Sequence, residues 1–217
     1  MRIALIIGST RSPRAGPQIS RWVADNITRS MQAEQARTTS GISLHLVDLA
    51  TWALPLFDEP AVPSQVTEVP AGYKHAHTRG WSAEIASYSA FVFVTPQYNW
   101  GYPAGLKNAI DYLFHEWKGK PAMVVSYGGR GGTKAGAQLR EVLRGCRMDV
   151  VEAEVALAFP NREVYKMASE GEPLGLEGHV GDEGSYWVDE RASLLAAWKD
   201  LTGKLEGKDK ELGKDIA

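Results

Sequence analysis

Three segments of this chain combine side chains and backbone suited to holding a flat, phosphorylated ligand. The first, residues 8–22 (GSTRSPRAGPQISRW), places hydroxyl and guanidinium groups directly before an apolar repeat typical of a helix. Because the first turn of a helix has free N–H groups and partial positive charge, this loop favours a phosphate. The chain contains neither G-x-x-x-x-G-K-[ST] nor G-x-G-x-x-G, which argues against an NTPase and an NAD-type dinucleotide fold. The alternative is a polar turn with two solvated arginines, Arg11 and Arg14.

The second and third segments would surround the ring of such a ligand. Residues 94–113 (VTPQYNWGYPAGLKNAIDYL) carry three aromatic side chains within five residues, at Tyr98, Trp100 and Tyr102. Residues 126–136 (SYGGRGGTKAG) contain five glycines, so the backbone can approach a flat ligand closely and offer N–H donors. Each loop alone is weak evidence, but a phosphate loop, an aromatic loop and a bare backbone loop together favour FMN.

The elements that would position these loops follow from the hydrophobic pattern. Apolar runs alternate with helical repeats, an order typical of a parallel α/β sheet whose ligand lies beyond the carboxyl ends of the strands. Residues 50–71 and 160–185 are expected to be long surface excursions. We predict one domain over residues 1–206 and a charged, frayed tail over 207–217. The predicted strands are residues 3–7, 44–49, 91–95, 122–127 and 150–159, and the predicted helices include 19–31, 106–117 and 194–205.

Composition narrows the expected partners and location. Among 217 residues, 24 are basic and 26 acidic, so a net charge of −2 gives no reason to expect nucleic acid or an anionic membrane as partner. No apolar run approaches the roughly 20 residues of a membrane span, and the few apolar residues before GST are too short for a signal peptide. Cys146, the single cysteine, follows Leu139, Val142 and Leu143 at the spacing of one apolar helix face, so we expect a buried structural thiol. A single cysteine cannot form an internal disulfide, which fits a cytoplasmic protein.

The three segments resemble a known family. GSTR, TPQYNWGYPAGLKNAIDYL and SYGGRGG, in this order and spacing, are similar to motifs of the NADPH-dependent FMN reductase family, which includes flavin, quinone, azo-dye and chromate reductases. The resemblance covers residues 1–158 and its middle motif is specific. It implies a flavodoxin-like, doubly wound, five-stranded parallel sheet in the order 2-1-3-4-5, with helices on both faces. It also implies a homodimer or homotetramer.

The resemblance implies non-covalent FMN binding by three groups of residues. Gln97 stands where many members have glutamate; it loses the charge but keeps a hydrogen-bonding side chain, which leaves open any subunit contact that depends on the carboxylate. The implied contacts are Ser9, Arg11, Gln18 and Ile19 with the phosphate, Pro96, Gln97, Tyr98 and Asn99 with the isoalloxazine, and Ser126, Tyr127, Gly128 and Gly129 with its pyrimidine side.

The expected activity is that of an oxidoreductase. Bound FMN would take hydride from NADPH or NADH and reduce small acceptors such as free flavin, quinones or azo compounds by a ping-pong mechanism. The N–H groups of Gly128 and Gly129 would stabilise negative charge on the reduced ring, and no residue is assigned as an acid or base. Arg130 is a candidate for contacting a 2′-phosphate, but the choice between NADPH and NADH stays open.

Two other functions remain possible at this point. A flavodoxin-like electron carrier would serve protein partners without turning over NADPH, although a net charge of −2 argues against a large acidic docking face. A scaffold without flavin would leave the arginine beside a helix start and the aromatic loop without a purpose. A visible spectrum separates the scaffold from the flavoproteins, and anaerobic NADPH separates the reductase from the carrier.

Several conspicuous residues are expected to have structural roles. His75 and His77 would diverge on a helix, so we predict surface residues and no metal site. Asn108 and Asp111 are expected to anchor their helix and the loop before it.

The tryptophans divide into two groups. Trp22, Trp117 and Trp198 occupy apolar stripes, whereas Trp100 is expected beside the flavin. Phe114 and Trp117 give the helix predicted from about residue 103 to 117 more apolar surface than one buried face needs. We therefore expect this helix near a homodimer interface.

Overall fold

The apolar runs of the sequence form one parallel sheet. The computed structural model describes residues 1–35, 41–176 and 186–214. Its strand order, β2-β1-β3-β4-β5, confirms the predicted flavodoxin-like order, and a sixth strand pairs with β4. β3 is buried along its whole length and β4 almost so, as befits central strands covered on both faces. The first four strands are β1 (Arg2–Ile7), β2 (Ser43–Asp48), β3 (Ala90–Pro96) and β4 (Pro121–Gly128).

The fifth position of the sheet differs from the prediction of one strand over residues 150–159. Two short strands, β5 (Asp149–Val150) and β6 (Val155–Ala158), pair in succession with β4. Between them, Glu152 and Glu154 form ion pairs with Arg144 and Arg140 of the neighbouring helix. The intervening segment therefore lies beside that helix, and the ladder with β4 is interrupted there.

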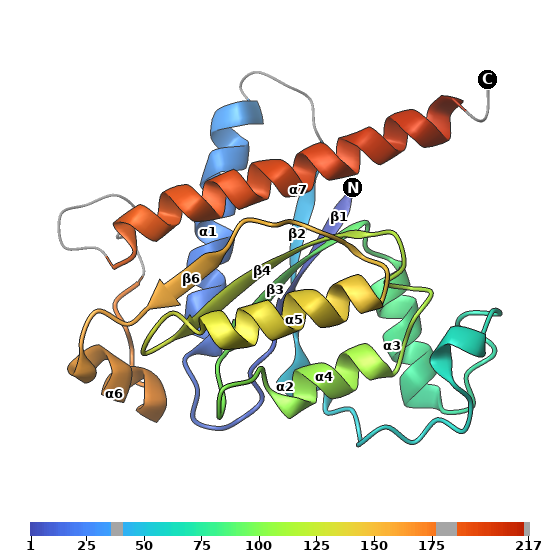
Figure 1. Cartoon of the computed structure of the whole chain (residues 1–217), viewed down its shortest axis with the longest axis horizontal. Helices are drawn as coiled ribbons and strands as arrows, with labels where there is room; N and C mark the ends of the chain where they lie inside the picture. Colours follow the sequence, from blue (N-terminus) through green and yellow to red (C-terminus); the bar gives the residue numbers. More distant parts are fainter. Residues whose placement is uncertain (36–40, 177–185, 215–217) are drawn as a thin grey trace.

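Helices cover both faces of the sheet (Figure 1), as predicted. Side chains alternate along each strand, so Ile3 and Leu5 of β1 join one core cluster while Ala4 and Ile6 join the other. The first face packs against α1 (Gly16–Gln35) and α7 (Val188–Lys214), and the second against α3 (Ala76–Ala86), α4 (Ala104–Asp111) and α5 (Thr133–Gly145).

The helix predicted to reach residue 117 ends earlier. α4 stops at Asp111, because the carbonyl of Ile110 accepts hydrogen bonds from the N–H of Leu113 at 3.2 Å and the indole N–H of Trp117 at 3.1 Å. Trp117 is fully buried against Phe91 and Trp81. Its ring therefore belongs to the core and contributes no apolar surface, which removes one premise of the predicted interface. Trp22 and Trp198 are buried as expected.

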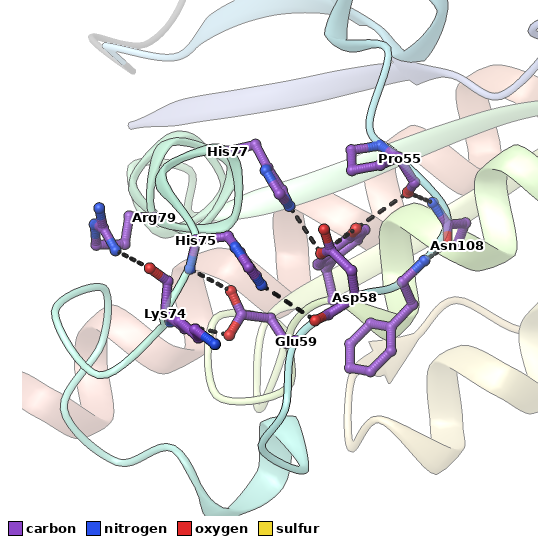
Figure 2. A network of polar contacts seen from close by, with 10 residues as sticks. Pro55, Asp58, Glu59, Lys74, His75, His77, Arg79 and Asn108 are labelled. Atoms are coloured by element: carbon purple, nitrogen blue, oxygen red, sulfur yellow. Dashed lines mark hydrogen bonds and ion pairs between the residues drawn. The ribbon is translucent and has the colours of Figure 1, made fainter.

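The excursion at residues 50–71 is held firmly at its base. It contains α2 (Leu49–Trp52) and the short 3-10 helix η1 (Pro63–Gln65). Asn108 of α4 accepts a hydrogen bond from the N–H of Phe57 at 2.9 Å and donates one to the carbonyl of Pro55 at 2.7 Å (Figure 2). Asn108 thus anchors the excursion, not the loop before its own helix, while Asp111 pairs with Lys107.

Two acidic side chains complete this anchorage. Figure 2 shows the carboxylate of Glu59 accepting hydrogen bonds from the N–H groups of Lys74 and His75, both at 2.9 Å. Asp58 Oδ1 accepts from the hydroxyl of Tyr112 at 3.0 Å and lies 2.9 Å from His77 Nε2. Partial burial acts to raise the pKa of Asp58, but the hydrogen bonds with His77 and Tyr112 outweigh it, so the pKa is lowered.

The two neighbouring histidines do not diverge as predicted. His75 lies in extended backbone before α3, so its ring stacks on that of His77 with centroids 5.2 Å apart and an interplanar angle of 5°. Both side chains are half-buried. Within residues 1–35, 41–176 and 186–214, no group of three His, Cys, Asp or Glu side chains is arranged to hold a metal.

The C-terminal part contains a helix that the sequence pattern did not suggest. Within the predicted excursion at 160–185, residues 162–170 form α6 (Arg162–Glu170); residues 177–185 lie outside the described part. Asn161 Oδ1 accepts from the N–H of Val164 at 2.9 Å, and Gly171 ends the helix with φ 72°. The segment predicted as a frayed tail is helical in α7 as far as Lys214. None of the described helices is long and apolar enough to cross a bilayer.

Cys146 follows the last turn of α5. Its side chain is half-buried and packs against the core cluster on that face of the sheet. Burial raises the pKa of the thiol, so the neutral form predominates and a packing role fits better than a reactive one.

Candidate functional site

Three loops meet beyond the carboxyl ends of β1, β3 and β4. Two backbone hydrogen bonds align them, from Gly8 N–H to the Val94 carbonyl at 2.9 Å and from Gln97 N–H to the Tyr127 carbonyl at 3.2 Å. A pocket opens at this edge, as expected for a doubly wound sheet. It is lined by Arg11, Arg14, Ala15, Pro96, Gln97, Tyr98, Tyr127, Gly128, Phe159, Tyr165, Ala168 and Ser169.

The first loop forms a small polar cradle at the start of α1. Ser9 is 1% exposed, and its hydroxyl makes no well-formed hydrogen bond to a described residue, although the Tyr127 hydroxyl lies near it. A Cβ at Gly16 would collide with Ser9 Oγ and come 3.0 Å from the Tyr127 hydroxyl, so only glycine leaves these two oxygens accessible to each other and to the loop. Together with the free N–H groups of the first turn of α1, this arrangement fits a phosphate.

Arg11 lies at the rim of the cradle. Its exposed guanidinium lies 5.7 Å from the centre of the Tyr98 ring and donates a hydrogen bond to the Ser169 carbonyl at 3.3 Å. The bond to a neutral carbonyl is long, whereas a phosphate would offer shorter, charge-assisted bonds. Arg11 is therefore the side chain of this loop best placed to meet an anion.

Arg14 has a different task, which the sequence did not suggest. Its guanidinium makes two hydrogen bonds to the carboxylate of Asp48, at 2.9 and 2.6 Å, and a third to the Ser9 carbonyl at 2.6 Å. Hydrogen bonding to Asp48 raises the pKa of Arg14. Asp48 ends β2 and also accepts from the N–H of Ala50, so it fixes the first loop to the end of a neighbouring strand.

Two residues expected at the phosphate face elsewhere. Ile19 is fully buried in the core, and its N–H bonds to the Ala15 carbonyl at 3.1 Å. The amide of Gln18 donates to the Glu172 carbonyl at 2.9 Å and accepts from the N–H of Leu174 at 2.8 Å. Gln18 therefore contacts the segment that follows α6.

The aromatic loop is a tight hairpin turn. Tyr98 and Gly101 exchange two backbone hydrogen bonds, at 2.8 and 3.0 Å, and the residues between them, Asn99 and Trp100, have φ of 45° and 71°. Positive φ at both central positions defines a type I′ turn, which non-glycine side chains adopt at a cost. The turn presents Asn99 and Trp100 to solvent, and Trp100 is 66% exposed. Burial raises the pKa of Tyr98, so its phenol stays protonated.

Gln97 links the aromatic loop to α5. Its side-chain Oε1 accepts from the N–H of Ala135 at 3.3 Å, in the first turn of a helix whose N-cap, Gly132, has no side chain to do so. An acceptor at this position satisfies one of the free N–H groups of the helix start. The glutamate common in the resembling family would add negative charge here, but the hydrogen bond needs only the oxygen.

Ser126, in β4, holds the glycine-rich loop that follows this strand. Its buried hydroxyl donates to the Gly131 carbonyl at 2.7 Å, so this side chain fixes the loop and does not face the pocket. Gly132 has φ 69°, and a Cβ there would lie 2.6 Å from the Tyr127 carbonyl oxygen. Only glycine allows the backbone at residue 132 to pack this closely on the backbone of Tyr127. In the loop between them, Gly128 is half-buried and Gly129 is exposed.

A second hollow adjoins the first on the side of this loop. Exposed Arg130 and Lys134 give it positive charge, and Trp100 and Tyr165 give it aromatic surface. Gln97, Gly128 and Tyr165 belong to both hollows, so a flat ring held in the first would border the second. The second hollow is lined by Gln97, Trp100, Gly128, Gly129, Arg130, Gly132, Thr133, Lys134 and Tyr165.

Comparison with known proteins agrees with this geometry. Residues 1–161 match the family described as NADPH-dependent FMN reductase. The chain belongs to this family. A NAD(P)H-dependent FMN reductase of Saccharomyces cerevisiae is 46% identical over 162 residues, which cover 74% of this chain and 82% of the yeast protein. A quinone reductase of Pseudomonas putida is 30% identical over 148 residues, 65% of this chain and 68% of that protein.

Solved structures share the fold. An oxidoreductase from Corynebacterium diphtheriae is 17% identical and superposes with a TM-score of 0.64 over 95% of this chain and 97% of that one. As a member of the NADPH-dependent FMN reductase family, the chain is an oxidoreductase that uses FMN and a nicotinamide nucleotide. The polar cradle, the aromatic turn and the bare backbone loop fit the phosphate and ring of FMN.

The structure adds residues that sequence reasoning missed. Arg14 and Asp48 form a clamp under the phosphate loop, and Phe159 and Tyr165 line the pocket from the C-terminal side. The caps of α6, Asn161 and Gly171, are sequence signals that could have revealed the helix carrying Tyr165. No local pattern links Arg14 to Asp48, because they are 34 residues apart.

The contact of Gln97 with α5 leads to a stability prediction. Gln97→Ala should lower the free energy of unfolding by about 0.5–2 kcal/mol, the usual effect of losing a helix N-terminal acceptor. In Gln97→Glu the free energy of unfolding at pH 7 should be higher than that of the wild type by about 0.3–1 kcal/mol, because the carboxylate faces the positive end of the helix. That gain should disappear as the pH falls through the pKa of the new carboxyl. Urea denaturation at pH 7 and pH 4 measures both, and an alanine variant as stable as the wild type contradicts the contact.

The strained turn leads to a second prediction. Trp100→Gly should leave the stability within about 1 kcal/mol of wild type, because glycine accepts positive φ and the lost side chain is exposed. Hydride transfer or acceptor reduction should slow on the order of ten- to a hundredfold, because an aromatic wall that orients ligands is lost. Trp100→Ala and Tyr98→Ala should likewise impair turnover more than folding. Thermal unfolding and stopped-flow measurement of each half-reaction test this, and wild-type rates in all three variants would contradict it.

Proposed function

We propose that this chain oxidises NADPH or NADH and passes the electrons to a small acceptor, such as free flavin, a quinone or an azo compound, in a ping-pong cycle. The observation that carries this proposal is the second hollow beside Gly128 and Gly129, which borders the flavin pocket and faces solvent. In the proposed cycle the nucleotide and the acceptor use this hollow in turn, so the nucleotide leaves before the acceptor enters. FMN, when bound, supplies the hydride-accepting ring nitrogen.

The residues of the chain bind, orient and stabilise charge. Ser9, the N–H groups of α1 and Arg11 hold the phosphate, and Pro96, Gln97 and Tyr98 bound the ring. The backbone N–H groups of Gly128 and Gly129 stabilise negative charge that develops on the pyrimidine side. Burial raises the pKa of Tyr98 and Tyr127, so both phenols remain hydrogen-bond donors. No side chain is assigned as an acid or base.

The charge of the second hollow supports a phosphorylated nucleotide as the donor. Arg130 and Lys134 are exposed on one side of it, and the aromatic surface of Trp100 lies on the same hollow. Cationic side chains would meet the phosphates of NADPH or NADH, and an extra 2′-phosphate would gain most from them.

Anaerobic reduction tests the proposed activity. Protein reconstituted with FMN and mixed with NADPH in a stopped-flow instrument should lose its visible flavin absorption rapidly, and later addition of a quinone should restore it. Steady-state measurements with varied NADPH and quinone should give parallel double-reciprocal lines, as ping-pong kinetics require. Bound FMN that NADPH and NADH fail to reduce would instead indicate an electron carrier. Intersecting lines would rule out the ping-pong order while leaving the reductase activity.

We infer further that the protein forms a homodimer, with the excursion at its interface. Leu56 is 85% exposed, Val62 55% and Phe57 36%, although Asn108 fixes the backbone at Pro55 and Phe57, on either side of Leu56. Apolar side chains held rigidly in solvent favour a covering surface, and a second copy supplies it most simply.

Leu56→Lys tests this interface. Because a lysine in an apolar contact must be desolvated, the variant should be a monomer at micromolar concentration where the wild type is a dimer. Leu46→Lys is the matched control, since Leu46 is 49% exposed on the edge strand β2. Light scattering of all three proteins decides the matter. A monomeric wild type contradicts the homodimer, and a dimeric Leu56→Lys variant contradicts this surface.

A further inference from the structure

The segment 162–174 lies against the flavin pocket, although it begins after the residues that match the family. α6 is found beside the loops at the carboxyl edge of the sheet (Figure 1). Three of its residues, Tyr165, Ala168 and Ser169, line the pocket together with Arg11, Tyr98 and Gly128. The wall on this side of the pocket thus comes from the chain that follows the family match at residues 1–161.

Three contacts tie this segment to the phosphate loop and α1. Arg11 donates to the Ser169 carbonyl at 3.3 Å. Gly171, with φ 72°, packs so closely on the loop that a Cβ there would lie 2.8 Å from Pro13 Cβ. The third contact, made by Gln18, is the best defined, because one side-chain amide both donates to Glu172 at 2.9 Å and accepts from Leu174 at 2.8 Å.

Tyr165 occupies the inner face of the segment where the two hollows meet. Its ring packs edge-on against Phe159, with centroids 6.1 Å apart. A Cβ at Gly129 would lie 3.5 Å from its Cδ2, so the ring faces the bare backbone loop. It is 53% exposed, and it lines both hollows. Because about half of the Tyr165 ring is exposed, a bound aromatic ring in either hollow can pack against it.

We propose that residues 162–174 form a cofactor-retaining wall, in which Tyr165 contacts the flavin ring system and Gln18 is a positioning residue that holds the wall in place. The side chain of Gln18 is then no phosphate ligand, because its amide oxygen and nitrogen are both engaged with the backbone of Glu172 and Leu174, and only its backbone N–H remains for the phosphate. The inference rests on FMN binding by the chain and is independent of the electron acceptor.

The two roles of Gln18 predict different ligand dependence. A residue that touches the phosphate matters for FMN but not for riboflavin, which has the same ring and no phosphate. A residue that holds a wall against the ring matters for both flavins by a similar factor. Arg11 supplies the comparison, since it lies at the cradle and is expected to contact the phosphate directly.

The experiment is titration of the apoprotein with FMN and with riboflavin, followed by quenching of flavin fluorescence. Gln18→Ala and Tyr165→Ala should each weaken binding of both flavins, roughly two- to tenfold for loss of one aromatic contact or of its support. Tyr165→Phe should bind like wild type, because it keeps the ring. Arg11→Ala should weaken FMN binding roughly ten- to a hundredfold and riboflavin binding much less. Lys166→Ala is the control on α6, since Lys166 is 73% exposed and absent from both hollows.

Further outcomes decide between the alternatives. In the double variant Gln18→Ala/Tyr165→Ala, the loss should be smaller than the product of the single losses, because both act through one wall. Loss of FMN but not riboflavin affinity in Gln18→Ala would overturn the positioning role. Tyr165→Ala binding both flavins as tightly as Lys166→Ala would overturn the wall. If the wild type binds no FMN, the proposed function is refuted together with the wall. If the wild type binds FMN and Tyr165→Ala binds it equally tightly, only the wall is refuted.

Discussion

The site depends on the alignment of three parallel strand ends. Gly8 bonds to Val94 and Gln97 bonds to Tyr127, so the loops after β1, β3 and β4 start at the same level of the sheet. Parallel ladders with this register bring loops that are far apart in sequence to one edge. Every contact of the flavin pocket, from the polar cradle to the bare backbone loop, is built outward from that edge.

Side chains of the chain itself fix the three loops. Arg14 and Asp48 fasten the phosphate loop, Gln97 joins the aromatic turn to α5, and Ser126 holds the glycine-rich loop. A pocket that is already ordered loses little conformational entropy on binding. The exposed strained turn at Trp100 is the exception, and strain retained at a ligand-facing position fits a functional role.

Two segments extend from the sheet and its covering helices. The excursion at 50–71 is anchored by Asn108 and Glu59 and carries apolar side chains outward. Gln18 bonds to the segment that follows α6, and α6 itself brings Tyr165 to the flavin pocket. The three loops form most of the pocket lining, and residues 159–169 complete it.

The hydrophobic pattern by itself determined the alternation of strands and helices and the place of the three loops, because burial imposes a period of about 3.6 on helices and leaves short apolar runs for buried strands, whereas the sheet order followed from the resemblance of the three motifs to the family. Only the tertiary structure decided where long polar side chains point. Gln18 belongs to the phosphate motif by position, yet its amide bonds to residues more than 150 positions away, and Arg14 meets Asp48 across the sheet edge. Trp117 shows the same for an apolar residue, because its indole ends α4 and joins the core. Periodicity records which face of an element is buried, whereas a hydrogen bond between distant segments depends on how those elements pack.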